Sequence, residues 1–401
     1  MAHELADRAS RRPLELRPLR ALRYDPARVG NLWDVTAPPY DVLDADTVAA
    51  LLQHPYNVVR LIVPRQRAGD VSPYAGVAHL LQSWRESGAL RVDPDPGLYV
   101  YEYTDDATVV RGLVGGVGVY DPAENVVLPH EEVMAQPVDD RLALMLATEA
   151  NLEPILLLYD GGGAASAVVA SVCQRPALAT ARTPEGCTHR LWQITDRGEL
   201  ATVAADLAPR QALIADGHHR YATYRRLRRE HPDLPGADVG LALLVDQTDH
   251  PLKVGAIHRS VAGLRLEDVR RSAQWTLLAH PDRASAVSAQ PPTAFVVTDG
   301  SSWFTATLTG GPATPAEEIA SLHETLLTAW GVPEGAVGYF HDADAAVRAA
   351  SAADGIAILT RASSVAEVMA AARAGARMPR KSTSFAPKPR MGLLMRALRA
   401  E

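Results

Sequence analysis

The stretch "QALIADGHHRYATYRRLRRE", residues 211–230, decides how the middle of the chain folds. Its first residues form an apolar run typical of a buried strand, and its last residues place arginines on the outer face of a helix. A glycine turn joins the two, so that a strand leads directly into a helix. This junction brings a set of polar and flexible residues to a helix N-terminus: Asp216, Gly217, His218, His219 and Arg220.

The composition is that of an ordinary folded protein, and its charge balance, cysteines and apolar runs indicate which kinds of partner to expect. At 401 residues the chain is long enough for two or three packed units. Its 40 Lys and Arg residues against 47 Asp and Glu residues argue against a general polyanion-binding surface, so we expect no nucleic-acid partner. Cys173 and Cys187 are not at metal-ligand spacing. No signal-peptide pattern opens the chain and no apolar run reaches roughly 18 residues, which predicts a cytoplasmic protein without a membrane partner.

Hydrophobic patterning and turn residues predict an α+β, mixed-sheet protein of several units. The predicted elements are a helix from about Asp44 or Asp46, a strand around 58–63, a hairpin of strands 97–104 and 108–120, a strand within 125–133, a helix within 139–150, and strands within 153–161, 189–196, 238–249, 252–261, 293–300, 303–308 and 355–360. The glycines of 112–118 are expected to lie in a strand, because no helix follows them as a phosphate loop would require. We expect an N-terminal α+β unit at 1–115, a core with an insert at 116–264, and a C-terminal α/β unit with a basic tail loop at 265–401.

The residues at the strand-to-helix junction suit phosphoryl chemistry. Unpaired N–H groups and the helix dipole favour anions at a helix N-terminus. Gly217 lets the backbone come close, Asp216 can hold a divalent cation or accept a proton, and the histidines and Arg220 can donate to phosphate oxygens. The alternative is a helix capped by Asp216, with histidines satisfied by their neighbours. Joint metal binding by His218 and His219 is less favoured, because adjacent helical residues point to different sides.

Three further clusters are candidates for the same chemistry. "PHEEV", residues 129–133, places Glu131 and Glu132 at a strand end, where either is a candidate general base or only a solvated turn acid. The tail "PRKSTSFAPKPR", residues 379–390, is either an anion-binding loop or a solvated terminus. Its candidate phosphate ligands are Lys381, Ser382, Thr383, Lys388 and Arg390. Two Pro-rich turns supply candidate substrate ligands that structural turns explain equally well: Asp41, Asn57 and Arg60.

Four separated motifs resemble a large, mostly bacterial family, the domain-of-unknown-function family ten-fifteen. They are "APPYDV" (37–42), "HEEVMAQPVDDR" (130–141), "ADGHHRYAT" (215–223) and "MPRKSTSFAPKPRMGL" (378–393). The central stretch is also similar to the ParB/sulfiredoxin-like superfamily and its free serine kinase branch, which carries the same D-G-H-H-R element. This resemblance implies a ParB/sulfiredoxin-like core. The chain departs from that branch by an insert at roughly 160–210, which leaves the identities of the phosphoryl donor and acceptor open.

The resemblance implies a Mg²⁺-dependent small-molecule kinase. It would move a phosphoryl group from pyrophosphate, ADP or ATP to the hydroxyl of free L-serine, giving O-phosphoserine. Glu131 matches the position of the branch's catalytic base best, though Glu132 stays open. Asp216 would position magnesium, and the tail residues from Lys381 to Arg390 would close over the donor. His218, His219 and Arg220 would neutralise charge on the transferred phosphate.

Two other readings of the same site stay open. No Walker-type motif or kinase H-R-D loop is present, so a small inorganic phosphoryl donor stays an alternative to a nucleotide. One alternative is a non-catalytic ParB-like switch module that holds CTP without a productive acceptor. The other is a phosphohydrolase, in which water replaces serine.

Overall fold

The computed structural model describes residues 11–65, 72–105, 108–184, 186–273, 275–310, 315–325 and 330–399. Its contacts separate two units. Unit 1 takes in the chain up to Pro129, then Val133–Leu252, and the chain from Pro387 onward; unit 2 takes in His130–Glu132 and Lys253–Ala386. The chain therefore leaves unit 1 twice and returns to it twice.

These units divide the chain differently from the three segments 1–115, 116–264 and 265–401. Strand β5 (Thr108–Gly118) crosses the first expected boundary. The composition shift near residue 265 follows the start of the long part of unit 2 at Lys253. The three segments stay a prediction about folding units, which limited proteolysis would test.

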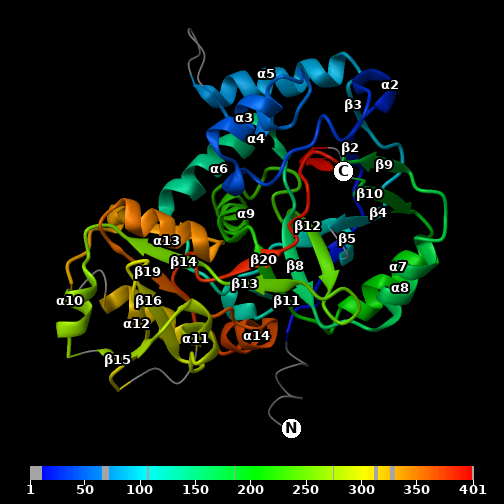
Figure 1. Ribbon diagram of the computed structural model, residues 1–401. Helices are drawn as coiled ribbons and strands as arrows, with labels where there is room; N and C mark the ends of the chain where they lie inside the picture. The colour runs from blue at the N-terminus through cyan, green and yellow to red at the C-terminus, as the bar shows by residue number, and fades with distance from the viewer. Residues whose placement is uncertain are drawn as a thin grey trace. The chain divides into compact units, whose positions relative to one another are not determined.

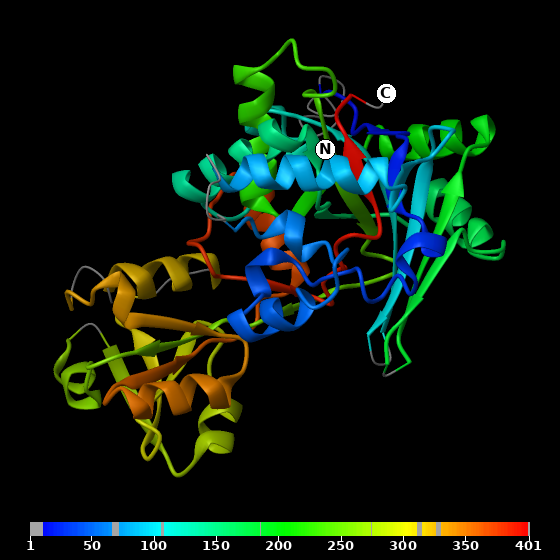
Figure 2. The ribbon, with the colours of Figure 1, turned by 90° about the horizontal axis from the view of Figure 1, so that it is seen from above.

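The large sheet of unit 1 is mixed. Within the described residues it holds nine strands, in the order β6 (Val127–Leu128), β11 (Ala212–Asp216), β8 (Ile155–Tyr159), β12 (Val239–Asp246), β5, β4 (Leu98–Asp105), β10 (Thr188–Ile194) and β9 (Ala179–Arg182), with β1 (Leu16–Arg17) paired to β5. β6 with β11 and β8 with β12 are parallel, and β11 with β8 is antiparallel. β12 is buried along its whole length, which is why its sequence is a continuous apolar run. The antiparallel strands β4 and β5 lie side by side in both ribbon views (Figure 1, Figure 2).

A smaller antiparallel sheet of unit 1 joins the two ends of the described chain. Its order is β3 (Leu90–Val92), β2 (Ala21–Tyr24), β21 (Met395–Ala397) and β7 (Ala150–Asn151). The helices of unit 1 are α2 (Pro26–Val29), α3 (Ala45–Leu51), α4 (Val59–Ile62), α5 (Pro73–Glu86), α6 (Ala135–Thr148), α7 (Ala164–Val172), α8 (Arg197–Leu207) and α9 (His218–Glu230), with short 3₁₀ turns η1 (Tyr40–Val42) and η2 (Pro122–Glu124). Asp44 caps α3 by accepting from the N–H of Thr47, which confirms the helix start predicted there.

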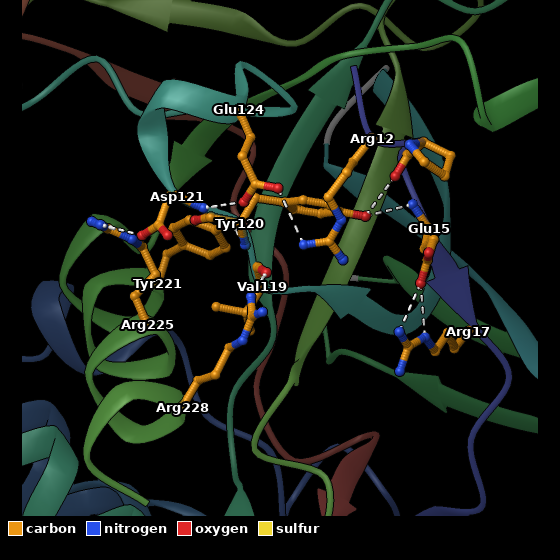
Figure 3. A network of polar contacts seen from close by, with 11 residues as sticks. Arg12, Glu15, Arg17, Val119, Tyr120, Asp121, Glu124, Tyr221, Arg225 and Arg228 are labelled. Atoms are coloured by element: carbon orange, nitrogen blue, oxygen red, sulfur yellow. Dashed lines mark hydrogen bonds and ion pairs between the residues drawn. The ribbon is translucent and has the colours of Figure 1, made fainter. Parts of the chain in front are cut away.

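Helix α9 is anchored through polar side chains spaced along one of its faces (Figure 3). The hydroxyl of Tyr221 accepts the N–H of Tyr120 at 2.9 Å. One turn further on, Arg225 forms an ion pair with Asp121, next to Tyr120. Arg228 donates to the carbonyl of Val119 at 2.5 Å. These positions follow the helical repeat. Part of the arginine-rich face predicted for α9 therefore fixes the helix, and with it the junction at its N-terminus.

Three sequence predictions need correction. The strand expected around 58–63 is helix α4, because Asn57 accepts the N–H of Val59 at 2.9 Å and so starts a helical turn. Val59, Leu61 and Ile62 are all fully buried, and an apolar run buried on every side has no period that separates strand from helix. The strand predicted within 125–133 is limited to β6. The strand predicted within 252–261 is two strands, β13 (Lys253–Gly255) and β14 (His258–Val261).

Unit 2 contains a second main sheet, which is antiparallel, together with helices. Within the described residues, its main sheet has the antiparallel order β15 (Trp275–His280), β17 (Trp303–Leu308), β16 (Ala294–Thr298), β19 (Ile356–Leu359), β14 and β18 (Val337–Phe340), and β13 pairs with β20 (Ser384–Ala386). Its helices are α10 (Leu266–Arg271), α11 (Arg283–Ser288), α12 (Pro315–Glu324), α13 (Ala343–Ala352) and α14 (Val365–Arg373), with the 3₁₀ turn η4 (Glu334–Ala336). Phe295 and Val297 enter one core cluster and Val296 the other, so both faces of β16 are covered.

The hairpin and the remaining strands predicted in 97–120, 153–161, 189–196, 238–249, 293–308 and 355–360 are confirmed. The turn expected between β4 and β5 includes residues outside the described ranges. Where the structure is described, no helix combines the length and apolar character needed to cross a membrane.

Candidate functional site

The junction between β11 and α9 has a left-handed glycine at its centre. Gly217 is the N-cap of α9 with φ 96° and ψ 31°, a conformation that L side chains rarely adopt. A Cβ added there would lie 2.8 Å from Ile155 Cγ2. Because glycine has no side chain, the cap position offers no acceptor to the first amides of α9. The alternative in which Asp216 caps the helix is therefore wrong, since Asp216 ends β11 and Gly217 takes the cap position.

Asp216 is held between two cations. Its Oδ1 lies 2.6 Å from Lys388 Nζ, and its Oδ2 lies 2.5 Å from Arg220 Nη2. Lys388 Nζ also lies 2.9 Å from Asp41 Oδ2. Burial alone would lower the pKa of Lys388, but the carboxylates of Asp216 and Asp41 outweigh it, so its pKa is raised. The structure thus brings together three of the predicted site residues from the beginning, middle and end of the sequence.

Arg220 is turned inward, with a side chain only 3% exposed. Its Nη1 donates to the carbonyl of Pro154 at 2.6 Å. Burial works against its charge, but Glu153, Asp216 and Asp41 raise the pKa above the ordinary arginine value. The Arg220 guanidinium therefore stabilises the junction by binding both Asp216 and the carbonyl of Pro154.

Glu153 is a buried acid of this site that sequence reasoning missed. It is 5% exposed, and burial raises its pKa although Arg220 and Arg141 oppose that shift. Its Oε1 accepts the N–H of Tyr40 at 3.4 Å, and the Arg141 guanidinium lies over the Tyr40 ring at 4.5 Å. A glutamate directly before a proline at the start of a buried apolar run was the signal available in the sequence.

The two histidines of the motif occupy different surroundings. His218 is 8% exposed. His219 Nε2 accepts the backbone N–H of Met134 at 3.1 Å, so in this arrangement its proton resides on Nδ1.

The residues around Asp216 do not fit a resident metal ion in this arrangement. Within the described ranges, no group of three or more His, Cys, Asp or Glu side chains is placed to hold one. The Lys388 ammonium contacts both Asp216 and Asp41, and so takes the place that a cation shared by these carboxylates would need. No catalytic step is therefore assigned to magnesium, which stays a prediction.

Glu131 lies in unit 2, where the tail loop surrounds its carboxylate. It forms a parallel bridge with Met378, and its Oε1 accepts from Ser382 N at 3.2 Å, Thr383 N at 3.2 Å and Thr383 Oγ1 at 3.1 Å. Burial raises the pKa of Glu131, although the donors of Thr383 and Ser382 pull it back down. The neighbouring Glu132 is exposed. These surroundings favour Glu131 over Glu132 as the candidate base.

His130, like Glu153, belongs to the candidate site but was given no role from the sequence. Its side chain is fully buried, and its Nε2 lies 2.8 Å from Thr383 Oγ1. Because that hydroxyl donates to Glu131, the geometry orders the three groups as a hydrogen-bonded row. The signal in the sequence was its place beside Glu131 in the "PHEEV" stretch.

The other predicted site residues mainly support local structure in unit 1. Arg390 lies over the Trp33 ring at 3.8 Å and donates to the carbonyl of Thr36 at 3.1 Å, and burial lowers its pKa to about 10. Asn57 Nδ2 donates to the carbonyl of Thr36 at 2.9 Å. Arg60 donates to backbone carbonyls of the preceding turn. The binding roles expected for these three residues stay predictions.

Comparison with known proteins identifies the family. Residues 16–325 match the family described as "Protein of unknown function (DUF1015)", and the chain belongs to it. No curated protein matches the chain.

Several solved structures are distantly similar. A free serine kinase in complex with AMP shows 18% identity over 65% of this chain and 83% of that chain, with a TM-score of 0.39. SbnI with a C-terminal truncation, from Staphylococcus aureus, shows 12% identity over 72% and 90%, with a TM-score of 0.39. A conserved hypothetical protein from Pyrococcus furiosus shows 18% identity over 66% and 88%, with a TM-score of 0.36. Similarity of this degree assigns no chemistry to this chain.

Proposed function

We propose that this protein is a small-molecule kinase that transfers a phosphoryl group to the hydroxyl of free L-serine, giving O-phosphoserine. The donor is pyrophosphate, ADP or ATP, and the core is of the ParB/sulfiredoxin-like type. The protein acts in the cytoplasm, where serine and these donors are available.

One observation carries the proposal: the Lys388–Asp216 contact at the start of α9. The third and fourth motifs of the family resemblance meet there, and they place an ammonium group beside a helix N-terminus whose cap is a glycine. Both features bind phosphate oxygens. In the proposed complex, Lys388 exchanges part of its contact with Asp216 and Asp41 for the donor phosphate, and the first amides of α9 bind the same group.

The proposed chemistry needs a base, and Glu131 is assigned that role. Its Oε1 is already held by three donors, so Oε2 takes the proton of the serine hydroxyl. The serine oxygen forms a bond to the terminal phosphorus, and the bridging P–O bond of the donor breaks. The leaving phosphate, AMP or ADP keeps the electron pair. A raised pKa makes Glu131 a better proton acceptor than an exposed glutamate.

Phosphorus NMR of the purified protein tests the proposal. L-serine is added with pyrophosphate, ADP, ATP or CTP in parallel, each with magnesium and again with EDTA. We expect a new phosphomonoester signal that requires both serine and a donor, and its loss in EDTA would support the magnesium prediction. Inorganic phosphate released without serine would instead identify a hydrolase. Donor-induced thermal stabilisation without any product would identify a non-catalytic switch.

A further inference from the structure

Arg259 in unit 2 is a buried cation with no carboxylate ion pair among the described residues. It lies on β14 and has no exposed surface. Its guanidinium donates to the carbonyl of Ile257 and, through Nη2, to the carbonyl of Lys381 at 3.0 Å; Nη2 also lies 3.2 Å from His323 Nε2. Burial lowers its pKa to about 10. Burying a charge without a counter-ion costs free energy. We therefore expect the hydrogen bonds of Arg259 to have a specific role.

The contact with Lys381 fixes one particular peptide bond. The carbonyl of Lys381 and the N–H of Ser382 belong to the same planar trans unit, and they point in opposite directions. Arg259 takes the carbonyl on one side, and Glu131 takes the N–H on the other at 3.2 Å. A change in the orientation of this peptide would remove both hydrogen bonds together.

The backbone at this peptide is in an unusual conformation. Lys381 has φ 58°, the left-handed region that non-glycine residues seldom occupy. This turn directs the consecutive N–H groups of Ser382 and Thr383 to the same atom, Glu131 Oε1. A conformation of this kind persists only where neighbouring groups hold it, and Arg259 is placed to do so.

We propose that Arg259 is a positioning residue for the candidate base. By binding the Lys381 carbonyl, it keeps the Ser382 N–H directed at Glu131. The catalytic part of this inference rests on the proposed function, whereas the positioning itself does not. None of the contacts given above joins Arg259 to Glu131 directly. Arg259 therefore acts on Glu131 through the Lys381–Ser382 peptide of the tail loop.

Thr383 provides an internal comparison within the same loop. Its N–H comes from the next peptide bond, and its hydroxyl is held independently by His130 at 2.8 Å. Loss of Arg259 should therefore release Ser382 from Glu131 more than it releases Thr383. A general electrostatic effect of the arginine would change both amides alike.

Several other groups face this cluster and bear on its pH dependence. They are His130 on the segment beside Glu131, His323 on α12, Tyr339 on β18, and Arg380 and Lys381 on the tail loop. His323 is held neutral near pH 7, because burial and the charges of Arg259 and Arg380 lower its pKa to about 4. Because His323 also titrates at acid pH, the test follows the individual amides of Ser382 and Thr383.

The first arm of the test uses the unmodified full-length chain. With ¹⁵N-labelled Ser and Thr, the amide signals of Ser382 and Thr383 are followed from pH 7 to pH 4. We expect both signals to shift with one midpoint, that of Glu131, and Glu131→Gln to abolish both shifts. If the Ser382 amide does not follow this titration, the proposal is wrong.

The second arm compares Arg259→Met and Arg259→Lys, each checked for folding by circular dichroism. In both, we expect the Ser382 amide to lose its shift while Thr383 keeps most of its own. Lysine retains the charge but cannot reach the carbonyls of Ile257 and Lys381 at once, so Arg259→Lys decides the question if Arg259→Met does not fold. Equal changes at Ser382 and Thr383 would overturn positioning and leave only a charge effect.

The kinetic arm applies once a donor is known. We expect Arg259→Lys to lower kcat about tenfold with little change in the donor KM, and to move the acid limb of kcat to higher pH. An unchanged kcat and pH profile would contradict the catalytic part. If the chain shows no transfer activity at all, the proposed function fails, while the amide titrations still decide whether Arg259 positions Glu131.

Discussion

Lys388 in the C-terminal tail forms a 2.6 Å ion pair with Asp216 at the end of β11. Lys388→Met would leave the carboxylates of Asp216 and Asp41 without their shared counter-charge. We expect the free energy of unfolding to fall by about 2–3 kcal/mol, at or just below the lower end of the range for breaking a buried pair, because both partners are partly accessible. Urea denaturation at neutral pH measures this loss. Arg229→Met, which removes an exposed pair with Glu230, is the matched control and should change little.

The stabilisation by Lys388 should also depend on pH in the alkaline range. Its pKa is raised in the folded state, so its contribution is complete below the unfolded-state value of about 10.4 and disappears as the pH rises through the higher folded-state value. We expect the stability difference between wild type and Lys388→Met to stay constant up to about pH 9.5 and then to shrink. A difference that grew above that pH would contradict the ion-pair account.

Glu131→Gln should abolish transfer without abolishing donor binding. A glutamine keeps the size of the side chain and accepts hydrogen bonds, but it cannot take the hydroxyl proton, so we expect kcat to fall by about 10²–10⁴-fold. Phosphorus NMR measures transfer, and thermal shift measures donor binding. The exposed neighbour gives the control, because Glu132→Gln should retain activity. Full activity in Glu131→Gln would exclude this residue as the base.

Activity should decline on the acid side at a pH above that of an ordinary glutamate. Burial raises the pKa of Glu131, and a base works only when it is deprotonated. We therefore expect kcat/KM to decrease as the pH falls through a midpoint higher than the usual value of about 4.3. A pH series between about pH 4 and 8 locates that midpoint. A midpoint below the ordinary value would mean that the loop donors outweigh burial.

Gly217→Ala should destabilise the junction through both backbone strain and a steric clash. The residue has φ 96°, and the new Cβ would lie 2.8 Å from Ile155 Cγ2. Gly30 is a useful control, since its φ is 79° but an added Cβ has no atom within 4 Å. We expect a loss of about 1 kcal/mol for Gly30→Ala and at least about 2 kcal/mol for Gly217→Ala. Equal losses would show that the approach to Ile155 is harmless.

His189 should contribute to acid sensitivity of unit 1. Burial, together with the charge of Arg390, lowers its pKa to about 4. The unfolded chain then binds more protons than the folded one between about pH 6.5 and 4, so the free energy of unfolding falls by about 3 kcal/mol over that range. We expect His189→Gln to be less stable at neutral pH, because it loses the 2.8 Å contact with the Tyr101 hydroxyl, but to show a flatter pH profile. An unchanged slope in urea titrations across this range would contradict the shift.

The motif at 211–230 predicted its own local structure correctly, because a buried strand, a glycine and a helix leave strong periodic signals. The contact between Asp216 and Lys388 was not available from such signals. It depends on the return of the chain to unit 1 after Ala386, which is a tertiary relationship. The family resemblance indicated that both motifs matter, but not that they meet.

The errors have a common physical origin. Helix α4 was predicted as a strand, because a buried apolar segment carries no amphipathic period. Asn57, whose side chain accepts the N–H of Val59 and starts the helical turn, is itself held by the carbonyl of Asp34, far from it in sequence. Arg259 and Glu153 escaped notice for a related reason. A charged residue within an apolar stretch becomes conspicuous only when its burial is known.

The placement of β21 between β2 and β7 has a consequence for biosynthesis. A ribosome releases the chain from the N-terminus, so β2 and β7 emerge long before the strand that joins them. Until the segment from Pro387 onward has emerged, the small sheet lacks its middle member and Asp216 lacks Lys388. Unit 1 therefore completes its folding only after all of unit 2 has been synthesised.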